Sequence, residues 1–352
     1  MGNNRVQLAK TSVKNEKKAY FAMCRVSLLL LFFAFSSRFL SDAAMSFIYD
    51  NNTYLTNLFV RTAAVFGVER QTSYAAAKML LTSEAFYEIL SMVISFVSLV
   101  LPAIIFEKCT RLRDAKCFNI KGEIVKWFIP MFFLCQLFTM LASVFSETLY
   151  SFLVPEWAVS MDAATGVVAS EFNGYEFVVR VLCTCILVPV IEEYVFRGVI
   201  FSYLKEYGLA FGVISSAVIF GLAHSAPVQS VYAFSFGLVS AFLVVICGNL
   251  KSSIMFHALN NFITIGSGYL MGTVNESIFS LINAVFIMTV SALGFVGMYK
   301  VFNDGGYMDT FREKANENDG GLVNKPGMFQ VLAFPVALYT VFYILDIVSR
   351  VL

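Results

Sequence analysis

Long apolar stretches separated by short polar ones dominate the pattern along this chain. A helix needs about 20 mostly apolar residues to cross the roughly 30 Å hydrocarbon core of a bilayer. Such stretches recur eight or nine times, over about 24–44, 85–106, 127–149, 176–204, 207–226, 229–249, 252–271, 277–299 and 328–348. The pattern predicts an all-α fold, a polytopic integral membrane helix bundle with eight or nine transmembrane helices.

Composition supports a membrane protein and excludes nucleic acid as its partner. Of 352 residues, 58% are hydrophobic and 14% are charged, against about 25% charged in ordinary globular domains. The net charge of +1 gives no field that would attract a polyanion, so nucleic-acid binding is excluded. The 7 cysteines include no CxxC pair, and we interpret them as reduced packing residues.

The distribution of charge predicts an orientation. Residues 1–25 form a basic tail with six Lys or Arg, and 107–126 carries six more, so the positive-inside rule puts both in the cytoplasm. Residues 147–176 hold five acids and no Lys or Arg, as an outer loop does. We interpret 45–84 as an outer loop with an interfacial helix, and the Gly-rich segment 303–326 as a solvated polar linker.

The few polar residues inside the apolar stretches are unusual. Between 207 and 298 the only charged residues are Lys251 and Glu276. Just before this segment, Glu192, Glu193 and Arg197 interrupt an apolar run, at a cost of about 2.5 to 3.5 kcal/mol each on insertion scales. Glu193 and Arg197 are spaced i, i+4 and can pair along one helix. Glu192 then points about 100° away, towards a neighbouring span.

Both histidines of the chain also lie within predicted spans. His257 and Asn261 are spaced i, i+4 and share a helix face, as do Phe220 and His224. Each residue alone has a structural interpretation: an ion pair that locks helices, or a hydrogen bond to a backbone carbonyl or across helices. Their joint occurrence on three helices of one bundle favours a functional site.

The chemistry open to this set is limited. A carboxylate, two imidazoles and an amide can activate water and stabilise an oxyanion, the two requirements of peptide-bond hydrolysis. No nucleophile arrangement competes, because Ser225 beside His224 lacks a GxSxG setting and no HExxH occurs. A transporter with protonatable Glu and His residues along its path is an alternative.

Three motifs give a family resemblance. EExxxR at 192–197, FxxxH at 220–224 and HxxxN at 257–261 resemble, in this order, the motifs of the CPBP intramembrane proteases. That family comprises the Ras-converting CAAX endopeptidases of eukaryotes and bacterial relatives, among them bacteriocin-processing and self-immunity proteins. The resemblance covers about 176–272, and the flanking regions are compatible with it but not diagnostic.

The resemblance implies a role for each motif residue. Glu192 is the general base, and His224 helps it to hold and activate water. His257 and Asn261 form the oxyanion hole, while Glu193 and Arg197 orient the site. We therefore take as the catalytic set the residues Glu192, Glu193, His224, His257 and Asn261, with Arg197 orienting.

A zinc variant stays open beside this scheme. The family has also been described as metalloproteases, and Glu192, His224 and His257 would then be three zinc ligands with an open position for water. Asn261 is a poor zinc ligand and a good hydrogen-bond donor, which favours the metal-free scheme. No cofactor is required by the motifs, and zinc is the one alternative.

The chain then divides into four regions: the cytoplasmic tail 1–25, an N-terminal transmembrane region 26–175 with its outer loop, core helices 176–272, and a C-terminal transmembrane region 273–352. The predicted function is endoproteolysis of a membrane-associated or lipidated peptide or protein, in a bilayer that we expect to be a bacterial plasma membrane. A non-catalytic scaffold or immunity-like binding protein of the same family is the alternative, and a proton-linked transporter is the third.

One geometric condition follows for this site. His257 lies only six residues past Lys251, at a predicted turn. With straight helices and a rise of 1.5 Å per residue, His257 would lie nearer the membrane surface than Glu192 and His224, by roughly 10 Å or more. Either the span over 252–271 is tilted, or the turn at 248–251 lies deep in the membrane.

Overall fold

The computed structural model describes residues 2–110, 128–153, 174–224, 227–303 and 306–319. All secondary structure in these ranges is helical, which confirms the all-α fold. The first part of the chain forms α1 (Gly2–Asp50), α2 (Asn52–Val65), α3 (Arg70–Thr82), α4 (Glu84–Ser95), η1 (Phe96–Val100), α5 (Leu101–Thr110) and α6 (Phe128–Leu153).

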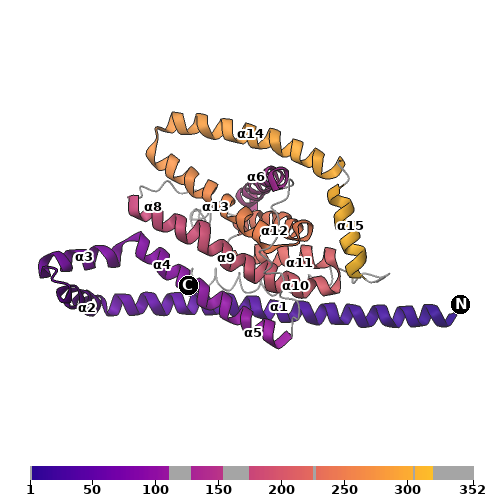
Figure 1. Cartoon of the computed structure of the whole chain (residues 1–352), viewed down its shortest axis with the longest axis horizontal. Helices are drawn as coiled ribbons and strands as arrows, with labels where there is room; N and C mark the ends of the chain where they lie inside the picture. Colours follow the sequence, from indigo (N-terminus) through magenta and orange to yellow (C-terminus); the bar gives the residue numbers. More distant parts are fainter. Residues whose placement is uncertain (1, 111–127, 154–173, 225–226, 304–305, 320–352) are drawn as a thin grey trace.

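The second part begins with one long rod and continues as a bundle. The rod consists of α8 (Gly174–Arg180), η4 (Val181–Leu187), α9 (Val188–Glu193), η5 (Tyr194–Phe201), α10 (Ser202–Leu204) and η6 (Lys205–Tyr207). It is followed by α11 (Leu209–Leu222), α12 (Pro227–Cys247), α13 (Leu250–Thr273), α14 (Glu276–Asn303) and α15 (Gly306–Asp319). Figure 1 shows α1 along one side and α14 along the opposite side, with α9, α11, α12 and α13 between them.

The described helices account for an integral membrane protein, but not for eight or nine spans. Six are long and apolar enough to cross a bilayer: Lys17–Asp50, Glu84–Thr110, Phe128–Ser146, Gly174–Tyr207, Gln229–Cys247 and Glu276–Asn303. The span expected over 207–226 is a shorter apolar helix, Leu209–Leu222. The one expected over 252–271 is present as α13 but is not among the six. The one expected over 328–348 lies outside the described residues.

Two of the polar segments differ from their predictions. Within 45–84, α1 continues to Asp50, and α2 and α3 follow it, so the segment holds more helix than the single interfacial helix that we predicted. The linker expected over 303–326 contains α15, which packs its partly buried Phe311 and Ala315 against apolar residues of the bundle. The predicted loops over 107–126 and 147–176 fall largely outside the described residues.

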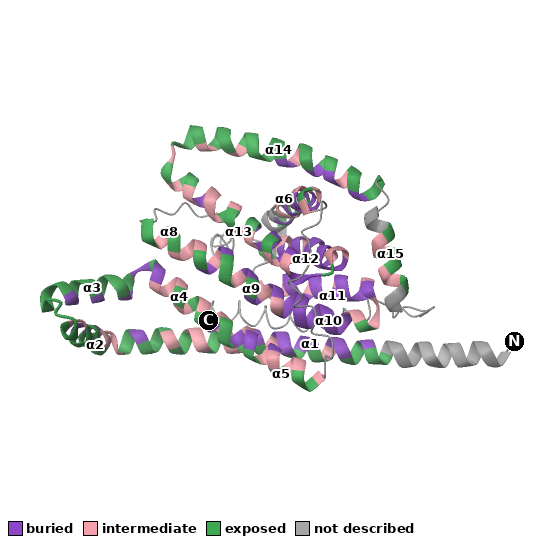
Figure 2. Cartoon of the chain, in the orientation of Figure 1, coloured by how far each residue is buried: buried purple, intermediate pink, exposed green. Residues whose placement is uncertain are grey.

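The buried residues concentrate where the rod meets α11 and α12 (Figure 2). Because lipid is as apolar as the side chains themselves, close packing and internal hydrogen bonds hold such helices together. Glycines permit that packing at two crossings. An added Cβ at Gly297 of α14 would lie 2.4 Å from the Pro130 carbonyl oxygen of α6, and one at Gly221 of α11 would lie 2.7 Å from the Ser230 oxygen of α12.

Substitution of Gly297 by alanine should destabilise the α6–α14 crossing. The new methyl group would displace one helix backbone, at a cost of about 1 to 3 kcal/mol, measurable as a lower unfolding temperature in detergent. Gly266→Ala is the matched control, because Gly266 has nothing within 4 Å of an added Cβ. Helix propensity should make that control neutral, or stabilising by up to about 1 kcal/mol. Equal destabilisation by both substitutions would contradict the packing argument.

Candidate functional site

A fully buried ion pair lies at the centre of the site. Glu193 ends α9 and Arg197 lies one turn later in η5, and both side chains have 0% to 1% exposure. Arg197 Nη1 lies 3.1 Å from Glu193 Oε1. The i, i+4 pair predicted from the spacing is therefore confirmed.

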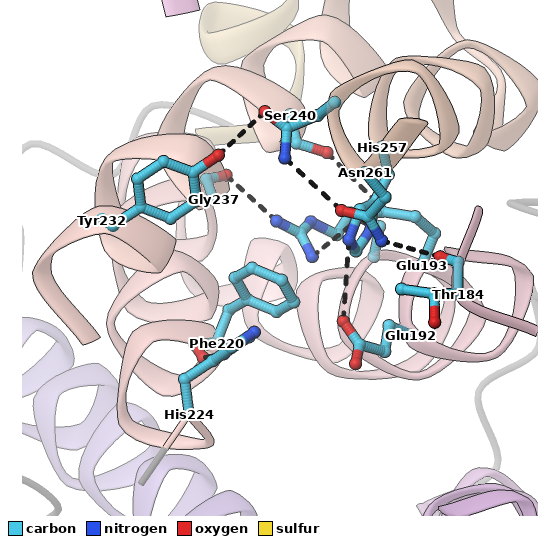
Figure 3. A network of polar contacts seen from close by, with 12 residues as sticks. Thr184, Glu192, Glu193, Phe220, His224, Tyr232, Gly237, Ser240, His257 and Asn261 are labelled. Atoms are coloured by element: carbon cyan, nitrogen blue, oxygen red, sulfur yellow. Dashed lines mark hydrogen bonds and ion pairs between the residues drawn. The ribbon is translucent and has the colours of Figure 1, made fainter. Parts of the chain in front are cut away.

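Two further helices donate to the same carboxylate. His257 Nδ1 on α13 lies 3.0 Å from Glu193 Oε1, and Ser240 Oγ on α12 donates to Oε2 at 3.1 Å. A carboxylate that is paired with Arg197 accepts hydrogen bonds and has none to donate, so Nδ1 carries the proton. Glu193 thus joins α9, α12 and α13 at one point (Figure 3).

Arg197 is enclosed mainly by apolar groups. Its guanidinium carbon lies 4.2 Å from the centre of the Phe220 ring, and Nη2 donates to the Gly237 carbonyl oxygen at 3.5 Å. Its Nε and Nη1 have no aligned hydrogen-bond acceptor among the described residues. The guanidinium is thus held by charge and by a cation–π contact. The net stability of the arrangement depends on keeping both charges together.

Glu192 has a different environment from its neighbour. Its side chain is 20% exposed, and its Oε2 lies 3.8 Å from His257 Nε2, which is too long for a hydrogen bond. Among the described residues no hydrogen bond to its carboxylate is found. As predicted, Glu192 faces another helix while Glu193 is paired, although both acids approach the same imidazole from its two nitrogens.

His224 is held by its own helix. It follows the end of α11, and its Nδ1 lies 2.8 Å from the Phe220 carbonyl oxygen. A carbonyl can only accept, so Nδ1 donates and Nε2 keeps a lone pair in the neutral ring. The Phe220 and His224 rings are in contact, with centroids 4.7 Å apart. The ring orientation is fixed, and no partner of its Nε2 is found among the described residues.

Asn261 is bound to the rod by a change in helix geometry. In η4 the Val188 N–H bonds to the Cys183 carbonyl, one residue earlier than in an α-helix. The carbonyl of Thr184 is thereby released from its usual helical partner. Asn261 Nδ2 donates to this oxygen at 2.8 Å. One of the two amide hydrogens of Asn261 is therefore occupied, and the other is available.

A second polar cluster fixes the orientation of that amide. Asn260 Oδ1 accepts from Gln136 Nε2 at 3.0 Å and from the Tyr232 hydroxyl at 2.9 Å. Asn260 Nδ2 in turn approaches Asn261 Oδ1 at 3.4 Å. Sequence reasoning missed Gln136 and Tyr232, as it missed Ser240 and Thr184. Their only signal was a single polar residue in an apolar run, which commonly bonds its own backbone.

The three candidate zinc ligands do not lie together in the structure. The described part of the chain contains no group of three or more His, Cys, Asp or Glu side chains that could hold a metal ion. Glu192, His224 and His257 do not form such a group, so the zinc alternative finds no support in this arrangement.

The turn that precedes His257 is buried inside the bundle. Gly248 has φ of +66°, and the next two residues, Asn249 and Leu250, have 2% and 0% exposure. α13 therefore starts inside the bundle, and its second turn brings His257 to the level of Glu192 and Glu193. The turn at 248–251 is thus buried among the helices, and the choice between a tilted span and a turn deep in the membrane stays a prediction.

One family model matches the segment that carries this site. Residues 174–263 match "Type II CAAX prenyl endopeptidase Rce1-like". The match contains all three motifs and confirms the resemblance to the CPBP and CAAX protease family. The comparisons with curated proteins and with solved structures gave no match.

Removing one member of the buried ion pair should destabilise the fold strongly. Arg197→Met would leave the Glu193 carboxylate without its cation, at a cost of about 3 to 5 kcal/mol. Combining it with Glu193→Gln should recover part of that loss, because the uncompensated charge disappears. Unfolding of the two single variants and the double variant in detergent measures this coupling. Additive losses would contradict a coupled pair.

Proposed function

We propose that this integral membrane protein is an intramembrane endopeptidase that hydrolyses a peptide bond of a membrane-associated or lipidated peptide or protein. The observation that carries the proposal is the unequal environment of two adjacent acids. Glu193 is fully paired inside the bundle, whereas Glu192 is partly exposed, accepts no hydrogen bond from the described residues, and lies with its Oε2 3.8 Å from His257 Nε2.

Glu192 is suited to be the general base. Glu193 is already engaged by Arg197, His257 and Ser240, whereas no hydrogen bond to the Glu192 carboxylate is found among the described residues. Glu192 takes a proton from water while the resulting hydroxide adds to the scissile carbonyl carbon. His224 assists by accepting a hydrogen bond from this water at its free Nε2.

The oxyanion is stabilised by His257 and Asn261. Asn261 has one amide hydrogen beyond its bond to Thr184. His257 serves as a donor at Nε2 when both ring nitrogens carry protons, because Nδ1–H is already given to Glu193. Glu192 then passes its proton to the leaving nitrogen. The C–N bond breaks, a carboxylic acid and an amine are released, and the base is regenerated.

The substrate class follows from the location of the site. The acids lie within a candidate span, Gly174–Tyr207, so a substrate reaches them from the bilayer or its surface. The matching family model is named for CAAX prenyl endopeptidases. A peptide anchored near its carboxyl terminus by an attached lipid is therefore the first substrate to test. A bacterial plasma membrane and a cytoplasmic N-terminus stay predictions from the sequence.

Glu192→Gln should abolish cleavage while the protein stays folded. The amide cannot accept the proton of water, so kcat should fall by at least about 10²-fold, the usual contribution of a positioned base. The assay compares the purified protein with its variants on lipid-anchored peptides in vesicles. His224→Ala should behave alike. The matched control is Glu206→Gln, since Glu206 is exposed at the end of the same rod.

The same samples separate the competing functions. Bound metal, measured beside activity, should be unrelated to cleavage, and a stoichiometric metal lost in Glu192→Gln would favour the zinc mechanism. Retained cleavage in Glu192→Gln would refute the assigned base. If wild type cleaves nothing and cells with either variant keep the wild-type phenotype, the scaffold function replaces catalysis.

A further inference from the structure

All four carbonyl groups at the end of α12 have donors, and one lysine of α15 supplies two of them. The last four carbonyls of a helix have no partner within that helix. Here the donors are the Gly248 N–H to Val244 at 2.9 Å, Lys314 Nζ to Val245 and to Ile246, the latter at 3.3 Å, and Asn249 Nδ2 to Cys247 at 3.0 Å. A cation at this position also complements the negative end of the helix dipole.

This helix end continues directly into the buried turn from which α13, the helix that carries His257, begins. Asn249 connects the two helices, since its Nδ2 caps α12 and its Oδ1 accepts the Ser252 N–H of α13 at 3.0 Å. Leu250, Ser252 and Ser253 are fully buried. His257 lies seven residues after Leu250 on the same helix, so a displacement of the turn moves the imidazole with it.

α15 is held against this turn by a few side chains. Figure 1 shows α15 running from α14 past the ends of α11 and α12. Phe311 packs on Phe242 of α12 with ring centroids 5.1 Å apart. Phe311 and Ala315 both join the cluster that contains Val245 and Leu250. Lys314 lies between them and reaches the backbone of α12.

We propose that Lys314 is a positioning residue of the hydrolytic site, which acts through the α12–α13 turn on His257. The inference rests on the proposed function for its catalytic meaning, but the link from Lys314 to His257 is a property of the fold. α15 lies outside the segment 174–263 that matches the family model. The catalytic segment therefore depends on a helix beyond its own boundary.

The kinetic test compares Lys314→Met with Lys314→Arg. Methionine keeps the apolar stem and removes the donors, so kcat should fall by about tenfold to a hundredfold with little change in KM, as a misplaced reacting group does. Arginine also donates N–H groups to two carbonyls and should restore most of the rate. The matched control is Arg312→Gln, because the Arg312 side chain is 72% exposed and pairs with Asp309 on the same helix.

A second readout is independent of activity. The chain has only 2 histidines, so protein labelled with ¹⁵N-histidine gives signals from two imidazoles, which His224→Ala assigns. In Lys314→Met the His257 signals should shift while those of His224 stay. If wild type shows no proteolysis, this result still supports the link, and the proposed function alone fails.

Two results would overturn the inference. One is an unchanged His257 spectrum in folded Lys314→Met. The other is an equal shift of both histidines, or the same shift in Arg312→Gln, which would indicate a general loss of stability. Should Lys314→Met not fold, Lys314→Gln keeps one donor group and is judged by the same two signals.

Discussion

The arrangement of the helices around the site depends on one ion pair, Glu193 and Arg197, which is buried from solvent. Neither Glu193 nor Arg197 can be buried at tolerable cost without the other. Their pairing leaves the carboxylate with further lone pairs, which His257 and Ser240 occupy from two other helices. The relative positions of α9, α12 and α13 are therefore set by this one polar group together with the close packing of the helices.

Small residues around the ion pair allow the neighbouring helices to approach it closely. Gly237 allows α12 to approach α11, since an added Cβ would lie 3.2 Å from the Ala217 Cα and 3.3 Å from the Phe220 ring. The same approach brings the Gly237 carbonyl to Arg197 and Phe236 to His257, with ring centroids 4.9 Å apart. Small residues at the crossings thus serve the polar site as much as the packing of the bundle.

The sequence predicted the buried ion pair of this site but not the groups that support it. The helices and the Glu193–Arg197 pair follow from the apolar period and the i, i+4 spacing. The roles of Thr184 and Lys314 could not be predicted. Release of the Thr184 carbonyl depends on a one-residue shift in hydrogen bonding that leaves the apolar pattern unchanged. Lys314 lies in a segment whose polar composition is that of a linker, and its partners are backbone atoms, which no side-chain pattern encodes.

Two acids in succession suit the proposed hydrolysis inside a membrane better than one. In that proposal a single carboxylate cannot both hold a buried arginine and accept a proton from water. On a helix, consecutive residues diverge by about 100°, so Glu193 turns into the bundle while Glu192 keeps 20% exposure on its open side. His257 lies between them, bound to the first by Nδ1 and directed to the second by Nε2. Glu193 thereby orients the imidazole that faces Glu192, the base in the proposed reaction, so the two acids act together.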